Sequence, residues 1–187
     1  MIPVIRLVQS LRYALKDMQQ AQISDFELIE SINQAASLLY TQMSENFVQF
    51  GMKKKIIVVD NTGSAELPQD FVRIHQVGLG DRQIAIPTSY QPTIDGTYRI
   101  IGTTFYAPEG SYGLEYYYIP TRVTDLSDNL DVPQSMSPYI EQIALAINGN
   151  NHEKALSIVK VCSDSLSARE ISHFANVGPV QVLGGKI

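Results

Sequence analysis

Residues 24–59 read SDFELIESINQAASLLYTQMSENFVQFGMKKKIIVV, and within this stretch the chain changes from a helical to an extended pattern. The opening SDFE has the spacing of a capping box, in which the side chains of Ser24 and Glu27 satisfy each other's backbone amides. Apolar residues then recur at steps of three and four, which predicts one long amphipathic helix that ends at Gly51. The β-branched run at 56–59 predicts a strand.

The same periodicities extend in both directions from this stretch. Upstream, an amphipathic helix that ends near Gln20 is predicted from one apolar face, formed by Val4, Leu7, Val8, Leu11, Leu15 and Met18. Downstream, glycine and proline separate short extended runs, which predict a small antiparallel sheet or open barrel. The predicted strands cover 71–77, 84–86, 98–101, 104–106 and 114–119.

Helical patterning returns at Pro138, a residue type that is favoured in the first turn of a helix. The pattern breaks at 148–151 and resumes, which predicts an antiparallel pair of helices that ends near residue 167. Between the strands and these helices, residues 121–137 look like a loop in which Asp125, Asp128 and Asp131 cap short turns.

The predicted fold class is α+β. Two N-terminal helices within 3–51 pack against the helical hairpin of 138–167, and the small antiparallel β region of 55–120 is inserted between them. Residues 1–171 then form a single domain. Residues 172–187 have no period and are expected to form an extended C-terminal arm.

Composition excludes several classes of protein. Charged residues make up only 18% of the chain and the net charge is -5, so no basic stripe is available to neutralise nucleic-acid phosphates. The one cationic run, at 53–55, is expected to be the solvated start of a strand. No apolar run approaches the roughly 20 residues that span a bilayer, so a soluble protein without a membrane partner is expected.

The residues that carry chemistry are few and scattered. His75, His152 and His173 fall in different predicted elements, and Cys162 lies on an apolar stripe, where we expect it to be buried and inert. These patterns predict no catalytic, cofactor or metal site, and therefore a protein that is not an enzyme.

A series of short motifs runs along the chain: Leu7-Val8-x-x-Leu11-Arg12, Ser24-Asp25-x-Glu27-Leu28-Ile29, Ile32-Asn33-Gln34-Ala35, Leu67-Pro68-x-Asp70-Phe71-x-Arg73-Ile74, Tyr98-Arg99-Ile100-x-Gly102, Leu114-Glu115-Tyr116-Tyr117, Asp131-Val132-Pro133 and Pro138-Tyr139. In this order, over about residues 4–166, the chain resembles the head-to-tail adaptor (connector) proteins of tailed bacteriophages, especially short-tailed ones.

The resemblance implies a structural virion protein at the head-tail junction, present in the host cytoplasm during assembly. Such adaptors are helical bundles with a β extension, and they form a homo-oligomeric ring, commonly of twelve subunits, between the portal protein and the tail. The ring seals the head and provides a platform for the tail, while genomic DNA passes through its lumen without sequence-specific binding. The alternatives are another neck or tail ring component, and a cellular small-ligand binding domain.

Two sets of contact residues are expected on this interpretation. The apolar arm residues Val177, Pro179, Val180, Val182, Leu183 and Ile187 would bind the portal, because a tail this apolar suits burial against another chain. Tyr112 and Tyr117 would face the tail, because four tyrosines crowd one strand and a small sheet face has room for only some of them.

Overall fold

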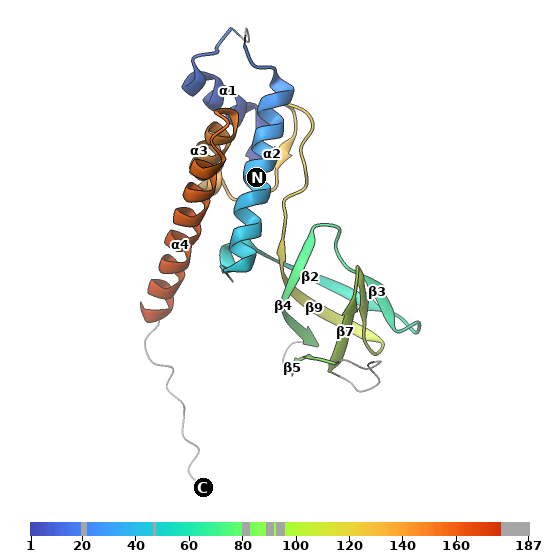
Figure 1. Cartoon of the computed structure of the whole chain (residues 1–187). Helices are drawn as coiled ribbons and strands as arrows, with labels where there is room; N and C mark the ends of the chain where they lie inside the picture. The colour runs from blue at the N-terminus through green and yellow to red at the C-terminus, as the bar shows by residue number, and fades with distance from the viewer. Residues whose placement is uncertain (20–21, 47, 80–82, 89–91, 93–95, 177–187) are drawn as a thin grey trace.

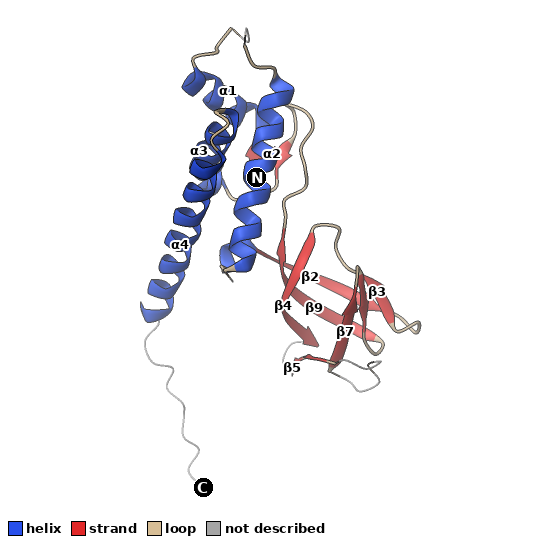
Figure 2. Ribbon diagram, in the orientation of Figure 1, coloured by secondary structure: helices blue, strands red, loops and turns tan. Residues whose placement is uncertain are grey.

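The computed structural model describes residues 1–19, 22–46, 48–79, 83–88, 92 and 96–176. The helices within these ranges are α1 (Val4–Leu15), α2 (Asp25–Glu45), α3 (Ser137–Asn148) and α4 (His152–Asn176), with 3-10 turns η1 (Gln49–Gly51) and η2 (Gln134–Met136). The strands are β1 (Ile2–Pro3), β2 (Met52–Val59), β3 (Ser64–Glu66), β4 (Phe71–Leu79), β5 (Gln83–Ile84), β6 (Ile86–Pro87), β7 (Thr97–Ile101), β8 (Thr104–Tyr106), β9 (Gly110–Tyr118) and β10 (Asn129–Leu130). The fold is α+β, as predicted, with the helices on one side and β2 to β9 on the other (Figure 1, Figure 2).

The capping box at the start of α2 is present as predicted. The Glu27 amide donates to Ser24 Oγ at 3.2 Å, and the Ser24 amide donates to Glu27 Oε2 at 2.8 Å. The bond from the Ser24 backbone amide, with a further one from its hydroxyl, holds the pKa of Glu27 below its usual value. The local sequence therefore defines where this helix begins.

Both N-terminal helices end earlier than their periodicity predicted. α1 ends at Leu15 because Lys16 takes the left-handed conformation, with φ 58°, and Met18 is consequently 62% exposed rather than part of the apolar face. α2 ends at Glu45 rather than at Gly51. There the chain folds back against the helix: the Val48 amide donates to the Met43 carbonyl oxygen, and Val48 is fully buried.

The core lies between α2 and the other three helices, each of which contacts it. The predicted apolar faces are buried for much of their length, and fully buried side chains such as Leu7, Leu39 and Ile143 come from α1, α2 and α3. Each such side chain stabilises the fold by about 1.5–3 kcal/mol relative to full exposure. The side chain of Ser10 also donates to Glu141 at 2.6 Å, which joins α1 to α3.

The β region consists of two four-stranded sheets, and β9 is central to the first. That sheet has the order β2-β9-β4-β5, and the second has the order β3-β8-β7-β6. All pairs are antiparallel except β6 with β7. Gly102, with φ 58°, forms the tight turn between β7 and β8, in the gap between the strands predicted at 98–101 and 104–106. A third, two-stranded sheet pairs β1 with β10.

The segment 121–137, predicted as a loop, contains β10 and η2. Asp125 and Asp128 cap turns there as predicted: Asp128 Oδ2 accepts from the amides of Thr124 and Asp125, and Asp125 Oδ1 accepts from the amide of Ser127. The third aspartate of that prediction, Asp131, pairs with Lys53 instead. These bonds from backbone amides keep the pKa values of both carboxyls below their usual range.

Lys53 joins the strands to the helical part, so its predicted role as a solvated residue is wrong. Its ammonium pairs with Asp70 at 2.7 Å and with Asp131, and it lies 4.0 Å from the centre of the Tyr118 ring. The Tyr118 hydroxyl donates to the Asp131 carbonyl oxygen at 3.1 Å and lies 3.3 Å from the hydroxyl of Tyr40 in α2. Although burial lowers the pKa of Lys53, the hydrogen bonds to Asp131 and Asp70 outweigh it and raise that pKa above its ordinary value.

The last helix is longer than the sequence predicted. α4 continues to Asn176, so residues 172–176, expected in an extended arm, are helical. A 25-residue helix is about 37 Å long. The remainder of the predicted arm, residues 177–187, lies outside the described residues.

Candidate protein-interaction surface

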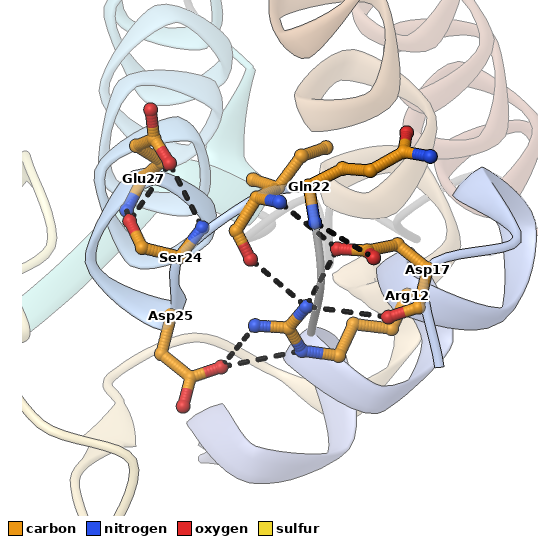
Figure 3. Close-up of polar contacts among 7 residues, drawn as sticks. Arg12, Asp17, Gln22, Ser24, Asp25 and Glu27 are labelled. Carbon is orange, nitrogen blue, oxygen red and sulfur yellow. Dashed lines mark hydrogen bonds and ion pairs between the residues drawn. The ribbon is translucent and has the colours of Figure 1, made fainter. Parts of the chain in front are cut away.

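Arg12 is the central residue of a group of polar contacts at the end of the molecule where α1 ends and α2 begins. Its buried guanidinium donates from Nη2 to Asp25 Oδ1 at 2.5 Å and from Nη1 to Asp17 Oδ2 at 3.0 Å (Figure 3). Nη1 also donates to the carbonyl oxygen of Ile23 at 3.0 Å. One side chain therefore joins the last turn of α1 to the following segment and to the first residue of α2.

Asp17 holds the same segment from the other side. Its Oδ1 accepts from the Gln22 amide at 3.1 Å, and its Oδ2 accepts from the Ile23 amide at 3.0 Å (Figure 3). A buried carboxylate needs both a cation and hydrogen-bond donors to offset the loss of water, and here Arg12 and the backbone amides supply them. A largely buried ionic network thus links the end of α1 to Gln22, Ile23 and the first residue of α2.

Each charged residue of this network is followed in the sequence by a large apolar residue at the surface. Tyr13 is 77% exposed, Met18 62% and Phe26 70%. Because Arg12 holds their neighbours together, these three side chains lie at the same end of the molecule, and we name them the tip patch. Single exposed apolar residues are common, but Tyr, Phe and Met together are the types enriched in the centres of protein interfaces.

The sequence did not predict the tip patch, although it held a signal. Tyr13 and Phe26 both lie off the apolar faces that the helical periodicity defined, and this position is a signal that an aromatic side chain points away from the core. Met18 was assigned to the buried face, and only the early end of α1 places it at the surface.

The structure buries both tyrosines that were expected to face the tail. Tyr112 is fully buried: its ring centre lies 5.3 Å from that of Phe105, and its hydroxyl donates to the Pro108 carbonyl oxygen at 3.0 Å. Tyr117, on the opposite face of β9, is 1% exposed. The prediction of surface exposure is wrong because Phe105 of β8 packs against Tyr112 and side chains of β4 pack against Tyr117, which removes the basis for assigning these residues to a contact.

Tyr117 shows how the second face of β9 is covered. Its ring meets the His75 ring edge-on at 6.0 Å between ring centres, and the Arg73 guanidinium lies 5.3 Å from its ring centre. Both neighbours come from β4. The other predicted contact residues, Val177, Pro179, Val180, Val182, Leu183 and Ile187, lie outside the described residues.

A groove of about 500 Å³ runs beside α2, further along the helix from the tip patch. We name it the α2 groove; its lining includes Glu30, Gln34, Ser37, Leu38, Ile119 and Pro120. The segment that follows β9 forms one wall of the groove and is bound to α2. The Asn33 side chain donates to the Val123 carbonyl oxygen at 2.8 Å and accepts from the Val123 amide at 2.9 Å. Arg122 adds an ion pair with Glu30. The groove is therefore preformed and mixed in polarity.

Cys162 is buried, as predicted, and burial raises the pKa of its thiol to about 11. Because the thiolate is the reactive form, we expect iodoacetamide to leave the folded chain unmodified at neutral pH and to label it in urea. Intact-mass measurement before and after unfolding checks this expectation. Rapid labelling of the folded chain would show that Cys162 is accessible.

Within the described ranges, no group of three or more His, Cys, Asp or Glu side chains is placed to hold a metal ion. None of the helices in those ranges has the length and apolar character that a membrane crossing requires. Comparison with models of known families and with curated proteins finds no match for this chain.

Proposed function

We propose that the chain is a structural subunit of a multiprotein assembly and that the tip patch is one of its contact surfaces. The observation that carries this proposal is the exposure of Tyr13, Met18 and Phe26 on a segment held by a buried ionic network. A preorganised aromatic surface reduces the entropy lost on binding, and Tyr is among the residue types that dominate binding energy at interfaces.

Within this class, we propose a head-to-tail adaptor of a tailed phage, of the short-tailed type. The motifs described above, from Leu7-Val8 to Pro138-Tyr139, support the choice. In this proposal the helices form a bundle, and the subunits assemble into a ring through these helices. The genome passes through the lumen of the ring without sequence-specific binding. In this proposal residues 177–187 bind the portal protein. The net charge of -5 suits the wall of a channel through which DNA must slide without adhering, because an acidic wall repels the DNA phosphates.

The β region would then face the tail, with different residues from those first expected. Ile56 and Val58 of β2 are 73% and 68% exposed, and β2 lies at the end of its sheet's strand order. An edge strand with outward apolar side chains can contact another chain. These two residues therefore replace Tyr112 and Tyr117 as the proposed tail contacts.

The tip patch can be tested with the double variant Tyr13→Ser/Phe26→Ser. Loss of an aromatic anchor costs about 2 kcal/mol or more, which lowers affinity by roughly 30-fold for each residue. We expect the variant to keep the circular dichroism spectrum and melting temperature of the parent chain. Its recovery in complexes purified through the portal ring should fall strongly, because residues 177–187 are then the only proposed contact with the assembly at this end.

The matched control is Ile56→Ser/Val58→Ser, which removes two side chains of similar exposure at β2. It should still join the portal. If both double variants are recovered equally with the portal ring, the tip patch is not a contact surface. If the unmodified full chain binds none of the portal and neck proteins encoded beside it, the adaptor function itself is wrong.

A further inference from the structure

We propose that the exposed face of the sheet β2-β9-β4-β5 binds an aromatic side chain, in a hollow whose floor is two glycines. This inference rests on the proposed function, because it names the type of side chain that the tail protein places beside Ile56. Gly113 of β9 pairs with Ile56 of β2 on one side and with Gly78 of β4 on the other. These residues line a hollow of about 440 Å³, which we name the glycine slot.

The contacts of Gly113 within the described chain give no reason for a glycine. Gly113 lies inside β9, and its φ is outside the left-handed region, so a residue with a side chain fits its backbone. A Cβ atom added there would meet no atom within 4 Å beyond its neighbours in the chain. The irregularities of the β4–β9 ladder lie between Phe71 and Gln76, away from the pair of glycines. Because a glycine weakens the interior of a strand, its presence points to another molecule that approaches this backbone closely.

The floor and wall of the glycine slot suit a planar apolar group. Neighbouring strands lie about 5 Å apart, so Gly113 and Gly78 together leave a strip of backbone without side chains. Ile56, which is 73% exposed, forms an apolar wall beside this strip. An aromatic ring that covers a glycine in a sheet restores the contacts that the missing side chain would have made.

The charges around the slot favour an aromatic side chain over a charged one. Lys54, Lys55 and Glu115 line the slot, and Lys54 pairs with Glu115 at 2.5 Å. One positive charge is thus in excess, which repels Lys and Arg and attracts the negative face of a ring. A carboxylate would lose its water against the apolar floor. The exposed amide of Gln76, also in the lining, can bond a tyrosine hydroxyl.

Binding of p-cresol, which is the tyrosine side chain as a free molecule, tests the slot without a partner protein. The full-length chain is labelled with nitrogen-15 glycine, and its amide signals are followed by NMR during titration. The signals of Gly113 and Gly78 should shift and saturate, while those of Gly63 and Gly102, in turns elsewhere, should not. The control compound is 4-methylcyclohexanol, which has the same shape class without the aromatic ring. It should bind roughly threefold more weakly, because it has no π face for the lysines.

Substitutions at Gly113 separate a role in binding from a role in folding. Gly113→Ala should raise the melting temperature by about 1–4 °C, because it removes a flexible residue and fills open space. Gly113→Val fills the slot and should abolish the shift at Gly78. The matched control is Ser111→Val, which places the same side chain at an exposed position of β9 and should leave p-cresol binding intact. A lower melting temperature for Gly113→Ala would mean that the glycine serves the fold, and would overturn the proposal.

The p-cresol titration separates this inference from the proposed function. If Gly113 and Gly78 do not respond to p-cresol, or if 4-methylcyclohexanol binds equally well, the aromatic site is wrong, even where the chain joins a portal ring. If p-cresol binds in the slot but the unmodified chain joins no portal or tail protein, the site stands and the adaptor function falls. In assembled particles Gly113→Val should prevent tail attachment and Ser111→Val should not; normal tails on Gly113→Val particles would show that the tail protein is not the partner.

Discussion

Replacement of Arg12 by alanine should lower the free energy of unfolding by about 3–5 kcal/mol, because it removes the cation that faces buried Asp17. The amides of Gln22 and Ile23, which also contact this carboxylate, are neutral and do not balance its charge. A loss of this size is a large share of the stability of an ordinary domain. Urea denaturation followed by circular dichroism measures it.

Arg6→Ala is the matched control, because Arg6 lies on the same helix and is exposed. It should change the unfolding free energy by no more than about 0.5 kcal/mol. Arg12→Lys should fall between the two, since an ammonium keeps the charge but loses the planar fork that reaches Asp17 and Asp25 together. Equal and small effects of Arg12→Ala and Arg6→Ala would mean that the network does not hold the two helices.

The second large effect is expected at Lys53. Lys53→Met removes the cation shared by Asp70 and Asp131 and leaves the two carboxylates facing one another. Hydrogen bonds to charged groups contribute about 1.5–3 kcal/mol each, and partial exposure reduces this, so we expect a loss of about 2 kcal/mol. The junction between β2 and the helical part should loosen, and limited proteolysis should separate the two parts faster than in the parent chain.

The pH dependence of that loss follows from the raised pKa of Lys53. The stabilisation is complete below the pKa of an unfolded lysine, about 10.4, and disappears only as the pH rises through the higher folded value. The difference between the parent chain and Lys53→Met should thus be constant from pH 7 to 9. Lys55→Met, which changes an exposed residue of the same strand, should be nearly neutral. A difference that shrinks within this range would contradict the ion-pair explanation.

Local patterns in the sequence predicted the elements well, because they depend on neighbouring residues. The capping box of Ser24 and Glu27 and the turn at Gly102 are of this kind. Ion pairs between residues far apart in the sequence could not be predicted from such patterns. Lys53 was placed in solvent because its partners Asp70 and Asp131 lie 17 and 78 residues away. Only the tertiary structure brings these charges together.

The candidate site was predicted less well than the fold, for a related reason. The crowding of tyrosines near β9 could not show which of them neighbouring side chains cover, so Tyr112 and Tyr117 were assigned to the surface, whereas both are buried. Conversely, the periodicity of α1 was continued to Met18 because one left-handed residue, Lys16, has no reliable signature in a single sequence. Exposure at the end of a helix depends on such a residue.

The pairing of β1 with β10 has a consequence for the order in which the chain is made. Ile2 pairs with Leu130, and Ser10 bonds Glu141, which lies 131 residues later. At a synthesis rate of about 5–20 residues per second, α1 leaves the ribosome on the order of 10 s before these partners exist. During that interval α2 is the helix available to shield its apolar face. The ionic network of Arg12, Asp17 and Asp25 lies within the first 25 residues and can close early, before the rest of the fold is translated.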